Sequence, residues 1–170
     1  MPDQLIKGRQ LADNVWTTLS IAEGEDLAGV TIPAGLVIVP APLWLARRDE
    51  LLARKGEIAV SLAPTFEVEA IAADVSQFAL IAIEFPKFAD GRGYSTARLL
   101  RERYSYRGEL RATGDVGRDQ LFFLSRVGFD AFLIPEGRDA QAALASFKDF
   151  PETYQTAVDQ PLPLFRRRAA

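Results

Sequence analysis

The sequence predicts an α/β domain built around a parallel sheet of four to five strands. Apolar segments of strand length alternate with amphipathic helical segments, at a spacing of roughly 20 to 30 residues from residue 57 onward. Residues 78–84 form a nearly continuous apolar run, as expected of a strand buried on both faces of a parallel sheet. At 170 residues, the chain has the length of one domain and falls short of the roughly 250 residues of a complete (β/α)8 barrel. We therefore expect an open, doubly wound sheet, with half a TIM-type barrel completed by dimerisation as the alternative.

The first third of the chain, residues 1–56, is expected to be an N-terminal segment of the same domain. Its apolar stretches predict strands at residues 15–21 and 36–39. A helix should then begin at Pro42, because the missing N–H of proline costs nothing in the first turn. The helix should end at Gly56, a residue type that commonly follows the last turn.

Residues 57–150 are expected to form the α/β core, and residues 151–170 a weakly structured, proline-containing C-terminal arm. The apolar periodicity predicts strands at residues 58–62, 78–84, 109–113 and 131–134. It predicts helices at residues 68–75, 95–104, 119–127 and 139–150. Apolar residues of the arm are available to pack on a partner, including a second copy of the chain, so a homo-oligomer is one expectation.

The composition excludes several kinds of site. The sequence contains no cysteine and no histidine, which removes disulfides, thiol redox chemistry, the usual zinc sites and customary haem or iron–sulfur ligation. Acid–base chemistry would fall to Asp, Glu, Lys or Tyr, because the side chain that titrates near neutrality is missing. We predict no metal site.

Charge and hydropathy give expectations about the location of the protein and about membranes and nucleic acid as partners. The N-terminus lacks the basic start and apolar run of a secretory signal, so a cytoplasmic protein is expected. Residues 28–46 are uncharged, but Pro33, Pro40 and Pro42 interrupt them, which argues against a membrane span. The net charge of −3 argues against nucleic acid as a partner.

Charged and glycine-containing loops follow three of the predicted strands. In parallel α/β sheets, ligands bind at the carboxyl ends of the strands, where loops and helix N-termini converge. Residues 85–118 carry eight basic and four acidic groups, a net +4, which leaves −7 for the rest of the chain. This asymmetry favours a small anion, a nucleotide or an acidic protein partner. The loops are Glu84-Phe-Pro-Lys-Phe-Ala-Asp-Gly-Arg-Gly-Tyr-Ser, Gly114-Asp-Val-Gly-Arg-Asp-Gln and Pro135-Glu-Gly-Arg.

The loop around residues 90–95 is the candidate cofactor-binding segment. Two glycines, an arginine and a following helix N-terminus suit a phosphate, sulfate or carboxylate, whereas the plain alternative is a glycine turn with Ser95 as N-cap. The loop is no P-loop, and Thr96 stands where a dinucleotide fingerprint needs its third glycine. The strand–loop–helix context still keeps a nucleotide or flavin open. The candidate binding residues are Asp90, Gly91, Arg92, Gly93, Tyr94, Ser95, Arg118 and Gln120.

Glu84, Lys87 and Asp115 are the candidate catalytic residues. A carboxylate at the end of an apolar strand is costly unless it is paired or functional, so Glu84 is a candidate general base. Lys87 is then an electrophile or anion clamp; in the structural alternative the two residues form an ion pair. Asp115 is either the N-cap of the next helix or a contact to substrate or ribose.

These loops also carry a family resemblance. The chain resembles the bacterial family called domain of unknown function 934, most specifically over residues 78–134. The matching segments are Phe85-Pro-Lys-Phe-Ala-Asp-Gly-Arg-Gly-Tyr-Ser, Ala97-Arg-Leu-Leu-Arg, Gly108-Glu-Leu-Arg-Ala, Gly114-Asp-Val, Arg118-Asp-Gln-Leu and Gly128-Phe-Asp-Ala-Phe.

The resemblance implies a role in assimilatory sulfate and sulfite reduction, together with sulfite reductase. Members of the family are often described as probable oxidoreductases, but no catalytic residues are established for them. Without Cys or His, an oxidoreductase of this sequence would need an organic cofactor or the redox centre of a partner. Three interpretations therefore stay open: an enzyme with a bound cofactor, a non-catalytic anion-binding module, and a docking module for sulfite reductase.

Overall fold

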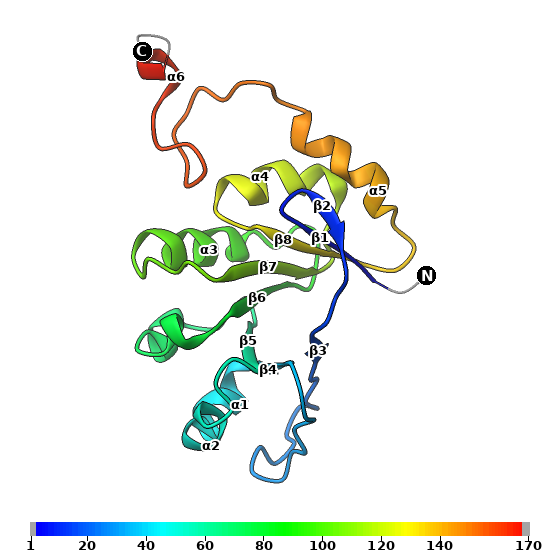
Figure 1. Cartoon of the computed structure of the whole chain (residues 1–170), viewed down its shortest axis with the longest axis vertical. Helices are drawn as coiled ribbons and strands as arrows, with labels where there is room; N and C mark the ends of the chain where they lie inside the picture. The colour runs from blue at the N-terminus through cyan, green and yellow to red at the C-terminus, as the bar shows by residue number, and fades with distance from the viewer. Residues whose placement is uncertain (1–2, 168–170) are drawn as a thin grey trace.

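The computed structural model describes residues 3–167; residues 1–2 and 168–170, at the outer ends of the expected N-terminal segment and C-terminal arm, lie outside it. The described residues form one eight-stranded sheet in the order β2-β1-β8-β7-β6-β5-β4-β3 (Figure 1). The strands are β1 (Gln4–Lys7), β2 (Gln10–Ala12), β3 (Thr17–Thr18), β4 (Val37–Pro40), β5 (Ile58–Leu62), β6 (Leu80–Phe85), β7 (Glu109–Gly114) and β8 (Ala131–Ile134).

The sheet is a curled half-barrel, mostly parallel, with antiparallel strands at one edge. Strands β3 to β8 are parallel neighbours in chain order, whereas β1 pairs antiparallel with β8 and β2 antiparallel with β1. A doubly wound sheet would reverse its strand order at a switch point. The expectation of four to five strands in a doubly wound sheet was therefore wrong, and the half-barrel alternative describes the fold.

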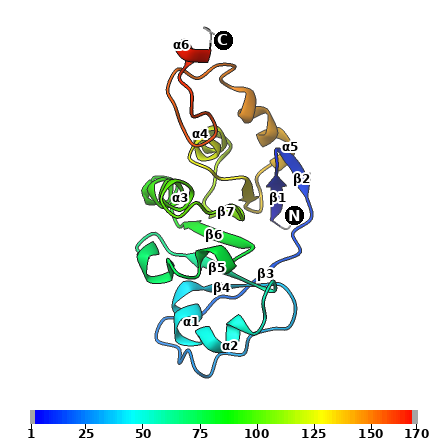
Figure 2. The ribbon, with the colours of Figure 1, turned by 60° about the vertical axis from the view of Figure 1, so that its left-hand side comes forward.

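Helices follow the strands and cover the convex face of the sheet (Figure 2). In Figure 1, α1, α2 and α3 lie to the left of the strands, while the connection from β2 to β3 runs on the right. The helices are α1 (Ala41–Ala46), α2 (Arg48–Leu52), α3 (Arg92–Glu102), α4 (Leu121–Arg126), α5 (Ala140–Ala143) and α6 (Leu164–Arg167). Among residues 3–167, no helix has both the length and the apolar character needed to cross a bilayer.

The two faces of β6 show how the core is divided. Ile81, Ile83 and Phe85 belong to the large core between the sheet and its helices. Leu80 and Ala82 point to the concave face, where they form a small cluster against which Trp16 packs. All of these β6 residues are almost completely buried, which confirms the prediction of a strand buried on both faces. Full burial of each large apolar side chain contributes about 1.5 to 3 kcal/mol.

Three predicted helices are shorter or differently wound. The helix predicted for residues 68–75 is two 3-10 turns, Val68–Ile71 and Val75–Gln77, because tertiary contacts fix Asp74 between them. Buried Asp74 accepts hydrogen bonds from Trp44 Nε1 (3.0 Å) and from Arg48 Nε (2.7 Å) and Nη2 (2.6 Å).

Contacts of Arg47 break the helix predicted from Pro42 to Gly56 into α1 and α2: its guanidinium binds Glu50 and the carbonyl of Val30. The predicted helix 139–150 is α5 continued by a 3-10 turn, Leu144–Lys148.

Candidate functional site

The loop between β6 and α3 is packed against the strand it leaves. A Cβ atom on Gly93 would lie 2.5 Å from Phe85 Cζ and 3.1 Å from Ile83 Cγ2, so only glycine lets α3 approach the sheet this closely. The ring of Tyr94 lies edge-on against that of Phe85, with 5.8 Å between the centroids. Gly93 therefore serves helix packing, and Tyr94 is placed beside the loop by this packing.

Asp90 and Arg92 bind one another at the start of α3. Arg92 donates from Nε to Oδ1 (2.9 Å), from Nη2 to Oδ2 (2.6 Å) and from its backbone N–H to Oδ1 (3.2 Å) of Asp90. The hydrogen bonds from the guanidinium, with the backbone N–H and the charge of Arg92, lower the pKa of Asp90 to about 2. The chain's own carboxylate thus binds the arginine that was expected to bind an anion. Ser95 is not the N-cap, because α3 begins three residues earlier.

Asp115 joins the loops that follow β6, β7 and β8. Its carboxylate accepts hydrogen bonds from the backbone N–H of Phe88 (2.9 Å) and from Arg138 Nη2 (2.5 Å). The guanidinium of Arg138, followed by the N–H of Phe88, lowers the pKa of Asp115. The residue before the 3-10 turn Arg118–Gln120 is Gly117, so Asp115 is not the N-cap of the next helix.

Gln120 completes the frame around the loop. Its side-chain oxygen accepts from the backbone N–H of Gly117 (2.9 Å), and its side-chain nitrogen donates to the carbonyl of Phe88 (3.0 Å). The peptide groups of Phe88 are therefore held from two sides, by Asp115 and by Gln120. These contacts hold the backbone of Phe88, whose exposed side chain lies at the strand-end surface.

Glu84, Lys87 and Arg118 are not brought together. The side chains of Glu84 and Phe85 point to opposite faces of the sheet, so Glu84 lies on the concave face, in register with Thr113 of β7. Lys87 and Arg118 are exposed at the surface. In the described part of the chain, none of these three side chains forms an ion pair, so the expected Glu84–Lys87 pair is absent.

Two cavities flank α3, and they divide the predicted binding residues. The first, which we call the α3–α4 cleft, has a volume of about 660 Å³. It is lined by Phe88, Ala89, Gly91, Tyr94, Arg98, Asp119, Gln120, Phe123, Arg126, Val127, Gln155, Thr156 and Ala157. The second, of about 510 Å³, places Arg92 and Ser95 opposite residues 64–69, which include the carboxylates of Glu67 and Glu69.

The α3–α4 cleft combines aromatic rings with hydrogen-bonding and charged groups. Phe88 and Phe123 are 49% and 52% exposed, and Tyr94 is half-buried. Burial, followed by the charge of Asp119, raises the pKa of Tyr94, so its hydroxyl stays protonated and can donate. Arg98 and Arg126 supply positive charge, although each is also paired with a carboxylate, Glu102 at 3.0 Å and Asp159 at 3.3 Å. Such a set can stack a planar ring and bind an anionic group beside it.

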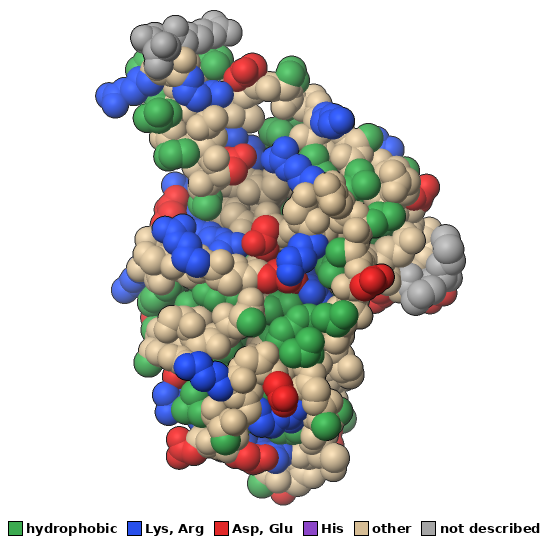
Figure 3. Space-filling view, in the orientation of Figure 1, with side chains coloured by type: hydrophobic (Ala, Val, Ile, Leu, Met, Phe, Trp, Pro, Cys, Tyr) green, Lys and Arg blue, Asp and Glu red, His purple; other side chains and the backbone are tan. Residues whose placement is uncertain are grey.

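Charge on this side of the molecule is mixed (Figure 3). Basic and acidic side chains lie next to one another across the middle of the view, as the Asp90–Arg92 and Asp115–Arg138 pairs do. The net positive charge of residues 85–118 therefore does not create a one-sign patch at the loops.

Several residues of the site, in the strand-end loops or lining the α3–α4 cleft, were missed by the sequence analysis. Arg138 lies in a strand-end loop that was recognised, but it was not singled out. Phe123 had a local signal: it follows Phe122 on a short helix, and two adjacent side chains cannot both lie on the same helix face. Arg126 and residues 155–157 had none, because the arm reaches the cleft only through tertiary contacts.

The comparisons with known proteins identify a family. The profile of the family described as "Bacterial protein of unknown function (DUF934)" matches residues 59–165, which include the cleft-lining residues of α3, α4 and the arm. The comparison with curated proteins and the comparison with solved structures each gave no match. Because the profile covers more than half of the chain, this chain belongs to the DUF934 family.

Proposed function

We propose that this protein is an accessory protein of sulfite reduction that binds a nucleotide or flavin in the α3–α4 cleft. One observation carries the proposal: the loops and helices that bear the family motif, together with the C-terminal arm, surround a cleft lined by three aromatic residues and two arginines. The sulfite-reduction context is supported by the family resemblance. The cleft supports the ligand class.

The size and lining of the cleft fit such a ligand. Its volume of about 660 Å³ lies within the range of roughly 300 to 1,000 Å³ in which small-molecule sites fall. Stacking of a base on an aromatic side chain is worth about 1 to 3 kcal/mol. Phe88 and Phe123 offer exposed rings for this contact, while Arg98 and Arg126 lie at the same cleft for a phosphate. A flavin would supply hydride or electron transfer when bound; the chain itself would bind and orient it.

The geometry favours a binding function over a catalytic one, because the candidate carboxylates are not placed to act on a ligand in the cleft. Asp90 and Asp115 already hold guanidinium groups, and Glu84 lies on the concave face and does not line the cleft. A small anion such as sulfite would compete with Asp90 for Arg92 and meet Glu67 and Glu69 in the neighbouring cavity. The oxidoreductase interpretation thus depends on a bound cofactor or on the redox centre of sulfite reductase.

A thermal-shift panel with FMN, AMP, NADPH, sulfite and phosphate tests the ligand class. A ligand at about 100 times its Kd stabilises a protein by about 2.7 kcal/mol, which raises Tm by about 5 to 10 °C for a chain of this size. We expect this rise with FMN or a nucleotide, and no rise with sulfite or phosphate.

Two variants locate the ligand. Phe88→Ala should abolish the rise, whereas Phe150→Ala should retain it, because Phe150 is similarly exposed but does not line the cleft. An unchanged Tm with FMN and with both nucleotides would rule out the proposal. So would a rise that survives Phe88→Ala.

A docking function is the second candidate, favoured by exposed aromatic residues beside the cleft. Phe123, Phe150 and Tyr154 are 52%, 50% and 68% exposed, and the rings of the two phenylalanines lie 5.9 Å apart. Sulfite reductase, or a second copy of the chain in a homo-oligomer, could cover them. Co-sedimentation with sulfite reductase that is lost in Phe150→Ala and Tyr154→Ala, but kept in Phe88→Ala, would favour docking.

A further inference from the structure

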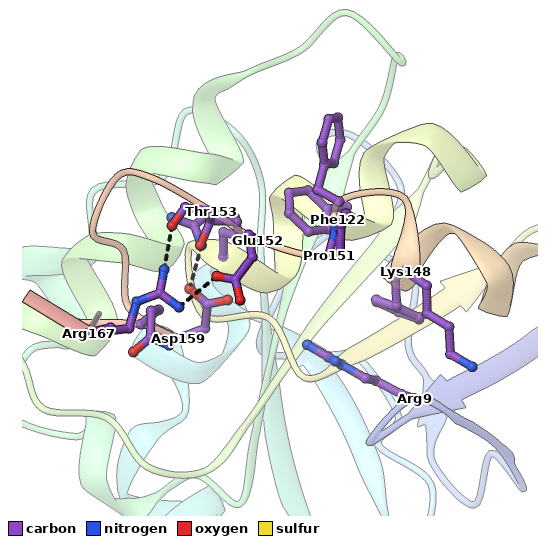
Figure 4. Close-up of a pocket in the computed structure, with 12 residues that line it drawn as sticks. Arg9, Phe122, Lys148, Pro151, Glu152, Thr153, Asp159 and Arg167 are labelled. Atoms are coloured by element: carbon purple, nitrogen blue, oxygen red, sulfur yellow. Dashed lines mark hydrogen bonds and ion pairs between the residues drawn. The ribbon is translucent and has the colours of Figure 1, made fainter. Parts of the chain in front are cut away.

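A third cavity lies between the β1–β2 hairpin, α4, the 3-10 turn Leu144–Lys148 and the C-terminal arm, and it is distinct from both cavities that flank α3 (Figure 4). Its volume is about 550 Å³. Arg9 reaches in from the hairpin, on the side opposite Glu152, Asp159 and Arg167 (Figure 4). We call this cavity the Arg9 pocket.

The charges of the Arg9 pocket do not balance. Four basic side chains line it, Arg9, Arg126, Lys148 and Arg167, against two acidic ones, Glu152 and Asp159, which leaves 4 − 2 = +2. The two carboxylates are already engaged: Asp159 lies 3.3 Å from Arg126 Nη1, and Glu152 lies 3.1 Å from Arg167 Nη1. Within residues 3–167, Arg9 and Lys148 form no ion pair.

Two further features concern the arginines that line the pocket. Arg167 Nε is buried without a hydrogen-bond partner among the described residues, and such an orphaned donor costs about 1 to 3 kcal/mol. Arg9 has φ = +64° in the two-residue turn between β1 and β2, a conformation that favours Gly or Asn. The two-residue turn requires a positive φ at both Gly8 and Arg9, so it fixes the backbone that carries the Arg9 side chain.

The remaining wall is aromatic. Phe122 and Phe150 stand with ring centroids 4.8 Å apart, and the guanidinium of Arg9 lies 5.6 Å from the ring centroid of Phe147. An apolar group can pack here next to the unpaired cations. We propose that the Arg9 pocket binds a phosphate monoester with a small aromatic or apolar substituent, about the size of a phenyl group and smaller than a nucleoside or a flavin, whose two negative charges match the surplus of +2. This site does not depend on the proposed function of the cleft.

Calorimetric titration of the full chain at pH 7.5 with phenyl phosphate, inorganic phosphate and phenol tests the proposal. Phenyl phosphate should bind more tightly than inorganic phosphate, and phenol should not bind. Arg9→Gln and Lys148→Gln should each weaken phenyl phosphate binding about tenfold, because each removes a charge-assisted contact. Binding should also weaken below a pH of about 6, where the monoester dianion takes up a proton and keeps only one negative charge.

Two control variants and one fallback variant complete the experiment. Arg107→Gln removes an exposed arginine that lines neither cavity and should leave the affinity unchanged. Phe88→Ala should also leave it unchanged, which separates this site from the α3–α4 cleft. Lys148→Gln alters an exposed side chain and decides the matter if Arg9→Gln fails to fold. Undetectable binding of phenyl phosphate, or equal affinity in both pocket variants and wild type, would overturn the proposal.

Discussion

The two ends of the parallel strands both carry charged residues, but they hold them in different ways. Near the amino ends, on the concave face, Glu109 lies 2.6 Å from Lys7 and 2.6 Å from Arg111, which also donates to Asn14 (2.9 Å). At the carboxyl ends, the Asp90–Arg92 and Asp115–Arg138 pairs lie at the surface. The side chain of Arg111 is 2% exposed, whereas that of Arg92 is 56% exposed.

This difference separates stability from binding capacity. A buried charge whose partner is removed has no solvent to replace it, so the network around Arg111 should matter for folding. Exposed ion pairs contribute little to stability. The residues at the carboxyl ends of the strands can therefore differ according to the ligand without a loss of folding. In barrel-like α/β folds, the same division places binding at the carboxyl ends of the strands and stability at the opposite ends.

Replacing Arg111 by methionine should have the largest effect on stability. The substitution leaves buried Glu109 with Lys7 alone and the side-chain oxygen of Asn14 with only the longer hydrogen bond from the backbone N–H of Trp16 (3.3 Å). We expect a loss of about 3 kcal/mol and a Tm lower by about 6 to 12 °C, measured by calorimetry. Arg103→Met is the matched control, because it breaks an exposed pair with Glu69 and should cost less than about 0.5 kcal/mol. Equal losses in the two variants would remove the contrast between the strand ends.

Gly93→Ala should have an intermediate effect. The new methyl group would press on the buried ring of Phe85, and overpacking of this kind costs about 1 to 3 kcal/mol. Gly91→Ala should be close to neutral, because nothing lies within 4 Å of its Cβ position and its φ is −85°. Urea denaturation of both variants measures the difference. Similar midpoints for the two variants would contradict the packing role of Gly93.

The Asp90–Arg92 pair should have the smallest effect, visible mainly in titration. The pKa of Asp90 is lowered to about 2 in the folded protein, below its ordinary value of 3.8. The stability it contributes is therefore complete above a pH of about 4 and is lost as the pH falls through about 2. Carboxyl NMR should give this pKa in wild type and a value nearer 3.8 in Arg92→Ala. A wild-type pKa already near 3.8 would show that the pair does not form in solution.

Local patterns in the sequence predicted the strands from residue 36 onward well, but they missed β1 and β2, and the strand predicted for residues 15–21 is only Thr17–Thr18. The arrangement of the strands was predicted poorly. Strands β5 and β8 have the predicted bounds, because short apolar runs between turn residues leave few alternatives. The order of strands depends on which face each connecting helix covers, and apolar periodicity carries no such information. The three strand-end loops do converge as predicted, since parallel strands end at one edge.

The candidate site could be predicted only in part, for a similar reason. Gly91, Tyr94 and Gln120 line the cleft, but Arg126 was missed because its partners are distant in sequence. It donates to Thr153 Oγ1 (2.8 Å) and to the carbonyl of Gln155 (2.6 Å), which holds the arm as a cleft wall. A proline-containing arm gives no periodic signal for such contacts.

Amide NMR during titration with FMN and with AMP tests the central claim most directly, because it reports both strand ends in one experiment. We predict that one of these ligands shifts the amides of Gly91, Tyr94 and Gln120 and of residues 155–157, while those of Asn14 and Arg111 stay in place. Shifts concentrated at Asn14 and Arg111, or none with either ligand, would contradict the assignment of binding to the carboxyl ends of the strands.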